Sequence, residues 1–229
     1  MIFDPFYLLF AIPGLIIAGL ASLYTHSTFA AYSEKHASSG MTGAEAAERM
    51  LRRSGLNDVT VERVDGFLSD HYDPLSRTLR LSPKVYDENS LSAIGVACHE
   101  AGHALQDAAG YAPLQFRSAL VPVTNIASYL SYILIFVGFI LHAGGMIMTG
   151  AIVFSLVVLF SIVTLPVEWD ASARAKKLMV AAGIVTEAER NDAGKVLNAA
   201  FLTYLAAVLS SLLILLYYIL RAIGMNRRG

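Results

Sequence analysis

The chain has 229 residues, of which 55% are hydrophobic and 15% are charged, and its mean hydropathy is +0.55. This composition is far from that of a soluble protein, and the net charge of -1 gives no reason to expect nucleic acid as a partner. Cys98 is the only cysteine, which excludes an intramolecular disulfide and a zinc site built from several thiolates.

Long uncharged stretches predict four membrane-spanning helices. The first, residues 6–24, is uncharged over the roughly 20 residues that a bilayer core requires. Its flank lacks the basic start of a cleavable signal peptide, so we expect a retained anchor. The stretch of about fifty residues between Arg117 and Glu168 suits two spans with a turn at "HAGG", residues 142–145. The last stretch covers residues 196–220.

These stretches divide the chain into five expected segments and set its orientation. They are an anchor at 1–24, a polar loop domain at 25–117, a transmembrane hairpin at 118–167, a helical loop at 168–196, and a final span with a basic tail at 197–229. The two loops share one side of the membrane and hold 14 of the 17 lysines and arginines. The positive-inside rule therefore predicts a multi-pass protein of the plasma (inner) membrane with both loops in the cytoplasm.

The first loop reads as a small α+β domain, so the fold class is an α-rich integral membrane protein with such a loop domain. Residues 42–55 open with a capping box, Thr42 and Glu45, and predict a helix. Residues 59–64, Phe67 with Leu68, and residues 79–81 have the character of short strands, with "DPLSRT" as a hairpin turn. Pro83 either ends the strand of "TLRLS", residues 78–82, or marks it as an edge strand.

Helical patterns return on both sides of the central spans. Residues 90–109 predict a helix that Gly110 stops, and residues 168–183 predict another that ends at Gly183. A second capping box, Thr186 and Glu189, then begins a helix that runs into the last span.

The segment "CHEAGHALQ", residues 98–106, carries the chemistry. His99 and His103 are four residues apart on a predicted helix, so both imidazoles can bind one zinc ion. Glu100 is placed to take a proton from a zinc-activated water as a general base. We expect Ala101 and Gly102 to leave room for substrate beside the metal.

A catalytic zinc site needs a third protein ligand and an open position. Ala109 stands where a third histidine of the metzincin pattern would be, which excludes that class. Glu168 is the first charge after the long uncharged stretch and is the favoured ligand. The alternative is that Glu168 only caps a helix, and Glu187 and Glu189 are weaker candidates. The other histidines are His26, His36, His71 and His142.

Four further residues are candidates for supporting roles. Asp170 and Arg174 are spaced to pair across one helix turn, and Asp170 could instead orient a histidine ligand. His71 or Tyr72 could donate a hydrogen bond to the oxyanion of a tetrahedral intermediate. The segment "TLRLS" could hold an extended peptide by main-chain pairing if it is an edge strand.

The segment "HYDPLSRTLRLSPKVYDENSLSAIGVACHEAGHALQ", followed by "LPVEWDASARA", resembles the YugP-type membrane zinc metallopeptidases, a bacterial family of neutral zinc proteases. The resemblance implies a zincin-like, gluzincin-type site with zinc on His99, His103 and Glu168 and with Glu100 as general base. The chain also resembles the HtpX and Ste24 proteases more distantly. Those have an aspartate four residues after the glutamate ligand, where this chain has Ser172.

These observations favour a membrane-anchored zinc endopeptidase that acts at the cytoplasmic membrane face. Its expected partners are peptide or membrane-protein substrates, the lipid bilayer and other membrane proteins. The alternative is a zinc-binding membrane scaffold or adaptor with little or no turnover. Intramembrane proteolysis is disfavoured, because the predicted spans contain no aspartate and Asp87, Glu88 and Asp107 flank the histidines.

Overall fold

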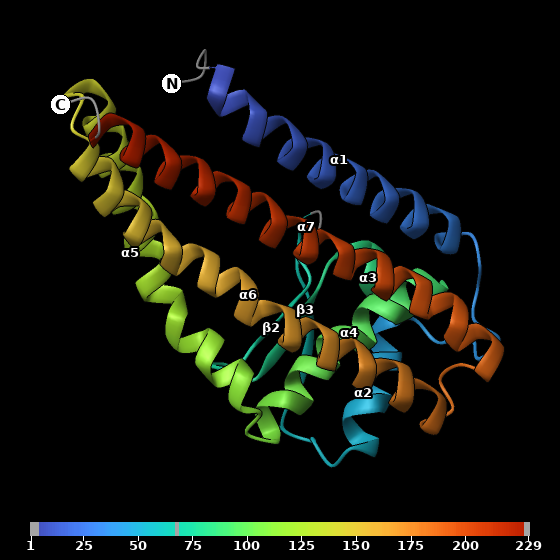
Figure 1. Ribbon diagram of the computed structural model, residues 1–229. Helices are drawn as coiled ribbons and strands as arrows, with labels where there is room; N and C mark the ends of the chain where they lie inside the picture. The colour runs from blue at the N-terminus through green and yellow to red at the C-terminus, as the bar shows by residue number, and fades with distance from the viewer. Residues whose placement is uncertain (1–4, 67–68, 227–229) are drawn as a thin grey trace. The chain divides into compact units, whose positions relative to one another are not determined.

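The computed structural model describes residues 5–66 and 69–226, so the predicted strand residues Phe67 and Leu68 lie outside the described residues. The described chain is mostly helical (Figure 1). Four helices are long and apolar enough to cross a membrane, as expected: α1 (Pro5–Ser33), α5 (Ala112–Ile140), α6 (Gly144–Ala181) and α7 (Glu187–Asn226). The shorter helices are α2 (Gly43–Arg53), α3 (Pro83–Asp87) and α4 (Leu91–Ala108).

Local signals set the helix ends. The capping box before α2 is confirmed, because Thr42 Oγ1 accepts from the Glu45 backbone N–H at 3.3 Å while Glu45 accepts from the Thr42 N–H at 2.9 Å. The same pair of bonds forms between Thr186 and Glu189 before α7. The turn predicted at "HAGG" is also confirmed, since α5 ends at Ile140 and α6 begins at Gly144.

The three short strands form one sheet in the order β1-β3-β2. They are β1 (Thr60–Arg63), β2 (His71–Asp73) and β3 (Thr78–Leu81). The predicted hairpin is confirmed because β2 pairs antiparallel with β3, but β1 pairs parallel with the other side of β3. The prediction that "TLRLS" is an edge strand was therefore wrong. The alternative that Pro83 ends the strand agrees with the structure, because β3 ends at Leu81 and Pro83 begins α3.

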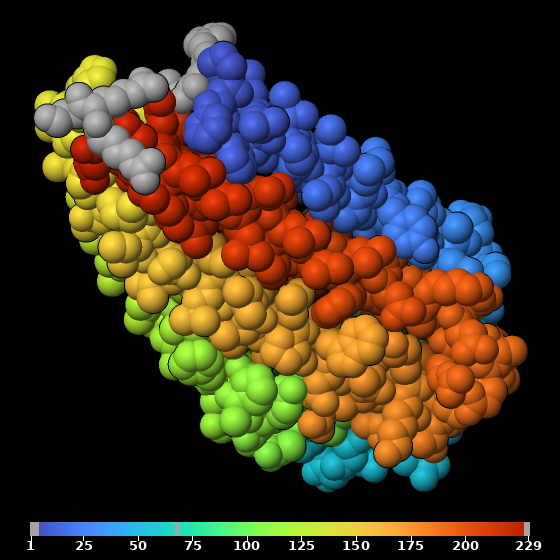
Figure 2. Space-filling model, viewed as in Figure 1, coloured from blue at the N-terminus to red at the C-terminus, as the bar shows by residue number. Residues whose placement is uncertain are grey.

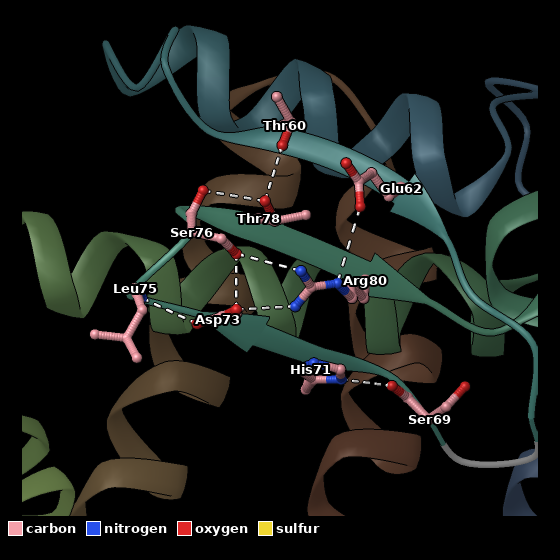
Figure 3. A network of polar contacts seen from close by, with 9 residues as sticks. All are labelled: Thr60, Glu62, Ser69, His71, Asp73, Leu75, Ser76, Thr78 and Arg80. Carbon is pink, nitrogen blue, oxygen red and sulfur yellow. Dashed lines mark hydrogen bonds and ion pairs between the residues drawn. The ribbon is translucent and has the colours of Figure 1, made fainter.

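Arg80 on the central strand β3 contacts acidic side chains on both neighbouring strands (Figure 3). Its guanidinium reaches Asp73 of β2 at 3.0 Å and Glu62 of β1 at 3.8 Å. The neighbouring residues Leu79 and Leu81 point to the other face and are fully buried. This alternation is the pattern of a strand with one side in a core.

Two compact units make up the chain. Unit 2 consists of Leu23–Gln115 and Pro166–Leu202. It holds the sheet, the short helices, and one end each of α6 and α7. Its core joins β3, α2, α4 and the ends of α6 and α7, and small side chains such as Ala47, Ala101, Ala175 and Ala193 are prominent in it.

Unit 1 runs up to Ser22 and then comprises Phe116–Leu165 and the chain from Thr203 on. Its core is aromatic: Tyr217 is fully buried on α7, packs edge-on against Tyr7 of α1 and stacks on Phe139 of α5. In Figures 1 and 2 this part of α7 runs between α1 and α6. Large apolar side chains also face outward in this unit, with Leu15 71% and Tyr129 76% exposed. Such exposure suits a hydrocarbon environment.

Candidate metal centre

Helix α4 presents the predicted histidine pair inside unit 2. It begins after Ser90, whose side chain accepts from the Ala93 N–H, and it ends before Gly110 as predicted. His99 and His103 lie one turn apart with ring centroids separated by 4.8 Å. The adjacent Cys98 is fully buried, and this burial raises the pKa of its thiol to about 12. Cys98 is not part of the group of side chains that lie close enough together to hold a metal ion.

Glu168 lies well inside α6 and is 2% exposed, so the alternative that it caps a helix is excluded. Its Oε2 is 3.1 Å from His99 Nε2 and 3.6 Å from His103 Nε2. Each of the three residues offers one ligand atom, and these atoms all lie within 4.8 Å of one another. Among the described residues, this is the group of histidine, cysteine, aspartate or glutamate side chains that could hold a metal ion. The structure therefore brings the carboxylate to the imidazoles from 65 residues or more along the chain.

Small residues allow α4 to approach α6 closely enough for this meeting. A Cβ atom added at Gly102 would lie 2.6 Å from the backbone oxygen of Ala171, one turn after Glu168. Ala101 is fully buried in the same core. The prediction that Gly102 and Ala101 leave room for substrate was therefore wrong, since the space beside them is filled by α6.

The separations of Glu168 from the two histidines fit one zinc ion. Tetrahedral zinc holds nitrogen and oxygen ligands at about 2.0–2.2 Å, which places two ligands roughly 3.4 Å apart. The distances of 3.1 and 3.6 Å from Glu168 to the two histidines lie on either side of that value. Two imidazoles and one carboxylate are also ligand types that zinc accepts, and three protein ligands leave one position open.

The charge on the two glutamates acts on His103. Burial alone would lower the pKa of this imidazole, but its contact with Glu168 and the charges of Glu100 and Glu168 outweigh burial and raise that pKa. Glu100 is thus close enough to the cluster for its carboxylate to be felt there. It lies on the same turn of α4 and is half-buried.

Gln106 holds the other side of the His103 ring and was missed by the sequence reasoning. Its amide nitrogen donates to Val167 O at 2.8 Å and to Asp170 Oδ2 at 2.9 Å, and both of these are acceptors. The amide oxygen must then be the atom that lies 3.0 Å from His103 Nδ1. Because that oxygen only accepts, Nδ1 carries a hydrogen, and the Nε2 lone pair of the neutral ring is left for a metal.

Asp170 supports the His103 ring indirectly, through Gln106. The predicted pair with Arg174 is confirmed, with Arg174 Nε donating to Asp170 Oδ2 at 2.6 Å. Asp170 reaches His103 through Gln106, an amide link that lies between carboxylate and imidazole. The three-residue spacing from His103 to Gln106 was the available signal, because it places both side chains on one helix face.

Ser172 stands beside the second histidine. Its Oγ is 3.1 Å from His99 Nδ1, at the position where more distant proteases carry an aspartate. A hydroxyl can donate or accept, so this contact orients the His99 ring without fixing its tautomer. The two imidazoles therefore contact neutral side chains, an amide and a hydroxyl.

The other candidates lie apart from this cluster or are otherwise engaged. His71 is exposed and its ring contacts the Ser69 carbonyl (Figure 3). Tyr72 donates its one hydroxyl hydrogen to Asp107 on α4 at 2.9 Å, and burial together with that carboxylate raises its pKa to about 12. Tyr72 could donate a hydrogen bond to an oxyanion only if it gave up its hydrogen bond to Asp107. Glu189 caps α7, and Glu187 pairs with Arg190.

Comparison with known proteins places this chain in a family. The family model described as "Putative neutral zinc metallopeptidase" matches residues 7–223. A relative named "Putative membrane protease YugP", from Bacillus subtilis (strain 168), is 46% identical over 214 residues, which cover 93% of this chain and 95% of the relative. No solved structure matches the chain.

Proposed function

Since the chain belongs to this family of neutral zinc metallopeptidases, we propose that it is a membrane-anchored zinc endopeptidase. Its substrates are peptides and membrane proteins with exposed ends. The observation that carries the proposal is the meeting of His99, His103 and Glu168 around one point, with Glu100 on the same turn of α4. Two imidazoles and a carboxylate that meet in this way are a ligand set that catalytic zinc sites use.

His99, His103 and Glu168 would hold the zinc ion. Glu100 would activate the attacking water, and Gln106 would orient His103. When bound, zinc supplies a Lewis acid that acidifies water and polarises a carbonyl oxygen. Glu100 accepts the proton of the attacking water at its carboxylate and returns it to the departing amine. Gln106 keeps His103 in the tautomer whose Nε2 faces Glu168.

We also propose that the site faces the cytoplasm, at the inner (plasma) membrane. The support is the charge distribution, because the two expected loops hold most of the lysines and arginines. In this proposal, residues 25–117 and 168–196 together form a zincin-like domain on the cytoplasmic side. The apolar helices anchor that domain beside its substrates.

The test is the substitution Glu100→Gln in the full-length, zinc-loaded protein. We expect cleavage of an unfolded protein substrate to fall by a factor of about 10² to 10⁴, the usual contribution of a general base, while one zinc per chain is retained. Glu48→Gln, an exposed glutamate on α2, is the matched control and should cleave as wild type. A chelator should abolish wild-type cleavage.

Two results would count against this function. If Glu100→Gln cleaves as fast as wild type, Glu100 is not the base and the mechanism is wrong. If the wild-type protein binds zinc but cleaves no membrane protein or unfolded substrate, the scaffold alternative replaces the enzyme.

A further inference from the structure

A groove lies between the parts of α6 and α7 that belong to unit 2. It has a volume of about 610 Å³ and is lined by polar and charged side chains, among them Lys176 and Lys177 of α6 and Arg190 and Asn198 of α7. Both helix segments are at the surface in Figure 2, in the orange part of the colour scale. The groove is separate from the metal cluster, and the peptidase proposal gives it no role.

The groove carries positive charge that the protein does not neutralise. Arg190 is paired with Glu187 at 2.7 Å. Lys176 donates to the neutral amide oxygen of Asn198 at 3.1 Å, and among the described residues neither Lys176 nor Lys177 forms an ion pair. Two uncompensated cations at one groove favour an anionic ligand.

The position of Lys176 is set by its surroundings. A Cβ atom at Gly194 would lie 3.2 Å from Lys176 Cδ, so the glycine lets the lysine stem lie against α7. The ammonium also lies 5.6 Å from the ring centroid of Trp169, within the range of a cation–π contact. These contacts hold the Lys176 side chain against α7.

Exposed apolar side chains lie beside the groove on both helices. Trp169 lies two helix turns before Lys176, is 58% exposed, and packs edge-on against Phe201 of α7 at 5.2 Å. Leu202, one turn after Asn198, is 40% exposed. Beyond these residues both helices continue as apolar stretches long enough to span a membrane. An aromatic ring between apolar helix and lysines is typical of a membrane interface.

We propose that this groove binds the headgroup of an anionic phospholipid. The phosphate lies against Lys176 and Lys177, and the acyl chains lie against Trp169 and Leu202. Basic pockets between membrane helices bind acidic headgroups in this manner. The apolar side chains beside the groove favour a lipid over free inorganic phosphate, which would use only the lysines.

Trp169 is the only tryptophan of the chain, so its fluorescence reports directly on the groove. The experiment uses the full-length protein in mixed micelles that contain phosphatidylglycerol or phosphatidylcholine with brominated acyl chains, which quench tryptophan on contact. We expect wild type to be half-quenched at a phosphatidylglycerol fraction about 30-fold lower than that of phosphatidylcholine. This ratio corresponds to two lysine contacts of ordinary strength with acidic lipid.

Variants assign the effect to the groove. Lys176→Gln with Lys177→Gln should bring the two lipids to nearly equal quenching, and arginine at both positions should restore the preference. The matched control is Arg52→Gln with Arg53→Gln on α2, which removes two exposed positive charges elsewhere in unit 2 and should keep the wild-type ratio. All variants should keep one zinc per chain, which separates this test from that of the peptidase.

The outcomes are decisive in both directions. Equal quenching of wild type by the two lipids overturns the proposal, as does an unchanged ratio in the double glutamine variant. If millimolar inorganic phosphate reverses the quenching by phosphatidylglycerol while sulfate does not, free phosphate is the ligand and the lipid assignment is wrong. Selective quenching that depends on the lysines and survives phosphate supports a lipid site.

Discussion

The two units of the chain fill their cores with side chains of different size. Unit 1 packs large aromatic side chains such as Tyr217 and Phe154 and leaves large apolar side chains on its outside. Unit 2 has many alanines and glycines in its core, and its helices touch through their backbones, as at Gly102 and Ala171. Glycine brings helix backbones together in unit 1 as well, since a Cβ atom at Gly144 would lie 2.8 Å from the backbone oxygen of Ala222. A polar cluster requires close backbones, because short side chains such as glutamate must meet across two helices.

The largest expected effect is the loss of bound zinc when one residue of the metal cluster is replaced. His103→Ala or Glu168→Ala should reduce bound zinc to background, since two ligands do not hold a catalytic zinc ion. His71→Ala and Glu187→Ala, which remove the same residue types outside the cluster, should keep one zinc per chain by atomic absorption. Full zinc occupancy in Glu168→Ala would show that the carboxylate is not a ligand.

The environments of the two units can be compared with one substitution at two exposed leucines. Leu15→Arg on α1 should raise the apparent free energy of membrane insertion by about 2.5–3.5 kcal/mol, the cost of arginine near the centre of a span. Leu75→Arg, in the turn between β2 and β3 and 97% exposed, should change stability by less than about 0.5 kcal/mol. A translocon insertion assay measures the first, and thermal unfolding the second. Equal insertion of Leu15→Arg and wild type would contradict a spanning role for α1.

The close packing of unit 2 can be tested at a single methyl group. Gly102→Ala should destabilise the protein by about 1–3 kcal/mol, because the new Cβ meets the Ala171 backbone and pushes α4 from α6. Zinc affinity should fall with it. Gly19→Ala on α1 meets nothing within 4 Å and should be neutral or stabilise by up to about 1 kcal/mol. Unfolding in detergent gives both values, and equal stabilities would refute the close contact.

The smallest expected effect concerns the amide that orients His103. Gln106→Met keeps the volume but removes the hydrogen bonds, and zinc affinity should fall about 10–100-fold in competition with a chelator. Gln115→Met, at an exposed glutamine on α5, is the control and should bind zinc as wild type. Asp170→Asn keeps an acceptor for Gln106 and should lose less than Gln106→Met. Wild-type affinity in Gln106→Met would remove Gln106 from any positioning role.

Predictions that depended on neighbouring residues agree with the structure. The capping boxes at Thr42 and Thr186, the helix stop at Gly110 and the hairpin between β2 and β3 all form where the sequence indicated. Each rests on bonds between residues a few positions apart, so the local chain contains all of the interacting groups.

Predictions that depended on long-range pairing had mixed outcomes. "TLRLS" became the central strand because β1 pairs with its free side, a parallel pairing that no local turn encodes. Ala101 and Gly102 were taken for open space because a small residue in a sequence does not show what fills the gap. Glu168 was placed with the histidines by its isolation in an apolar stretch. The contacts of Gln106 with His103 and of Ser172 with His99 were not predicted.

By itself, the sequence determined four long apolar helices, a histidine pair on one helix face and the ends of most helices. These follow from hydrophobic length, helical periodicity and capping, which act within a few turns. Only the tertiary structure decided the strand order, the contact of α4 with α6 and the hydrogen-bonded support of each imidazole. The contact of α4 with α6 and the contact of Ser172 with His99 join residues more than sixty positions apart in the chain. The strand order depends on a parallel pairing of β1 with β3 that no local turn encodes.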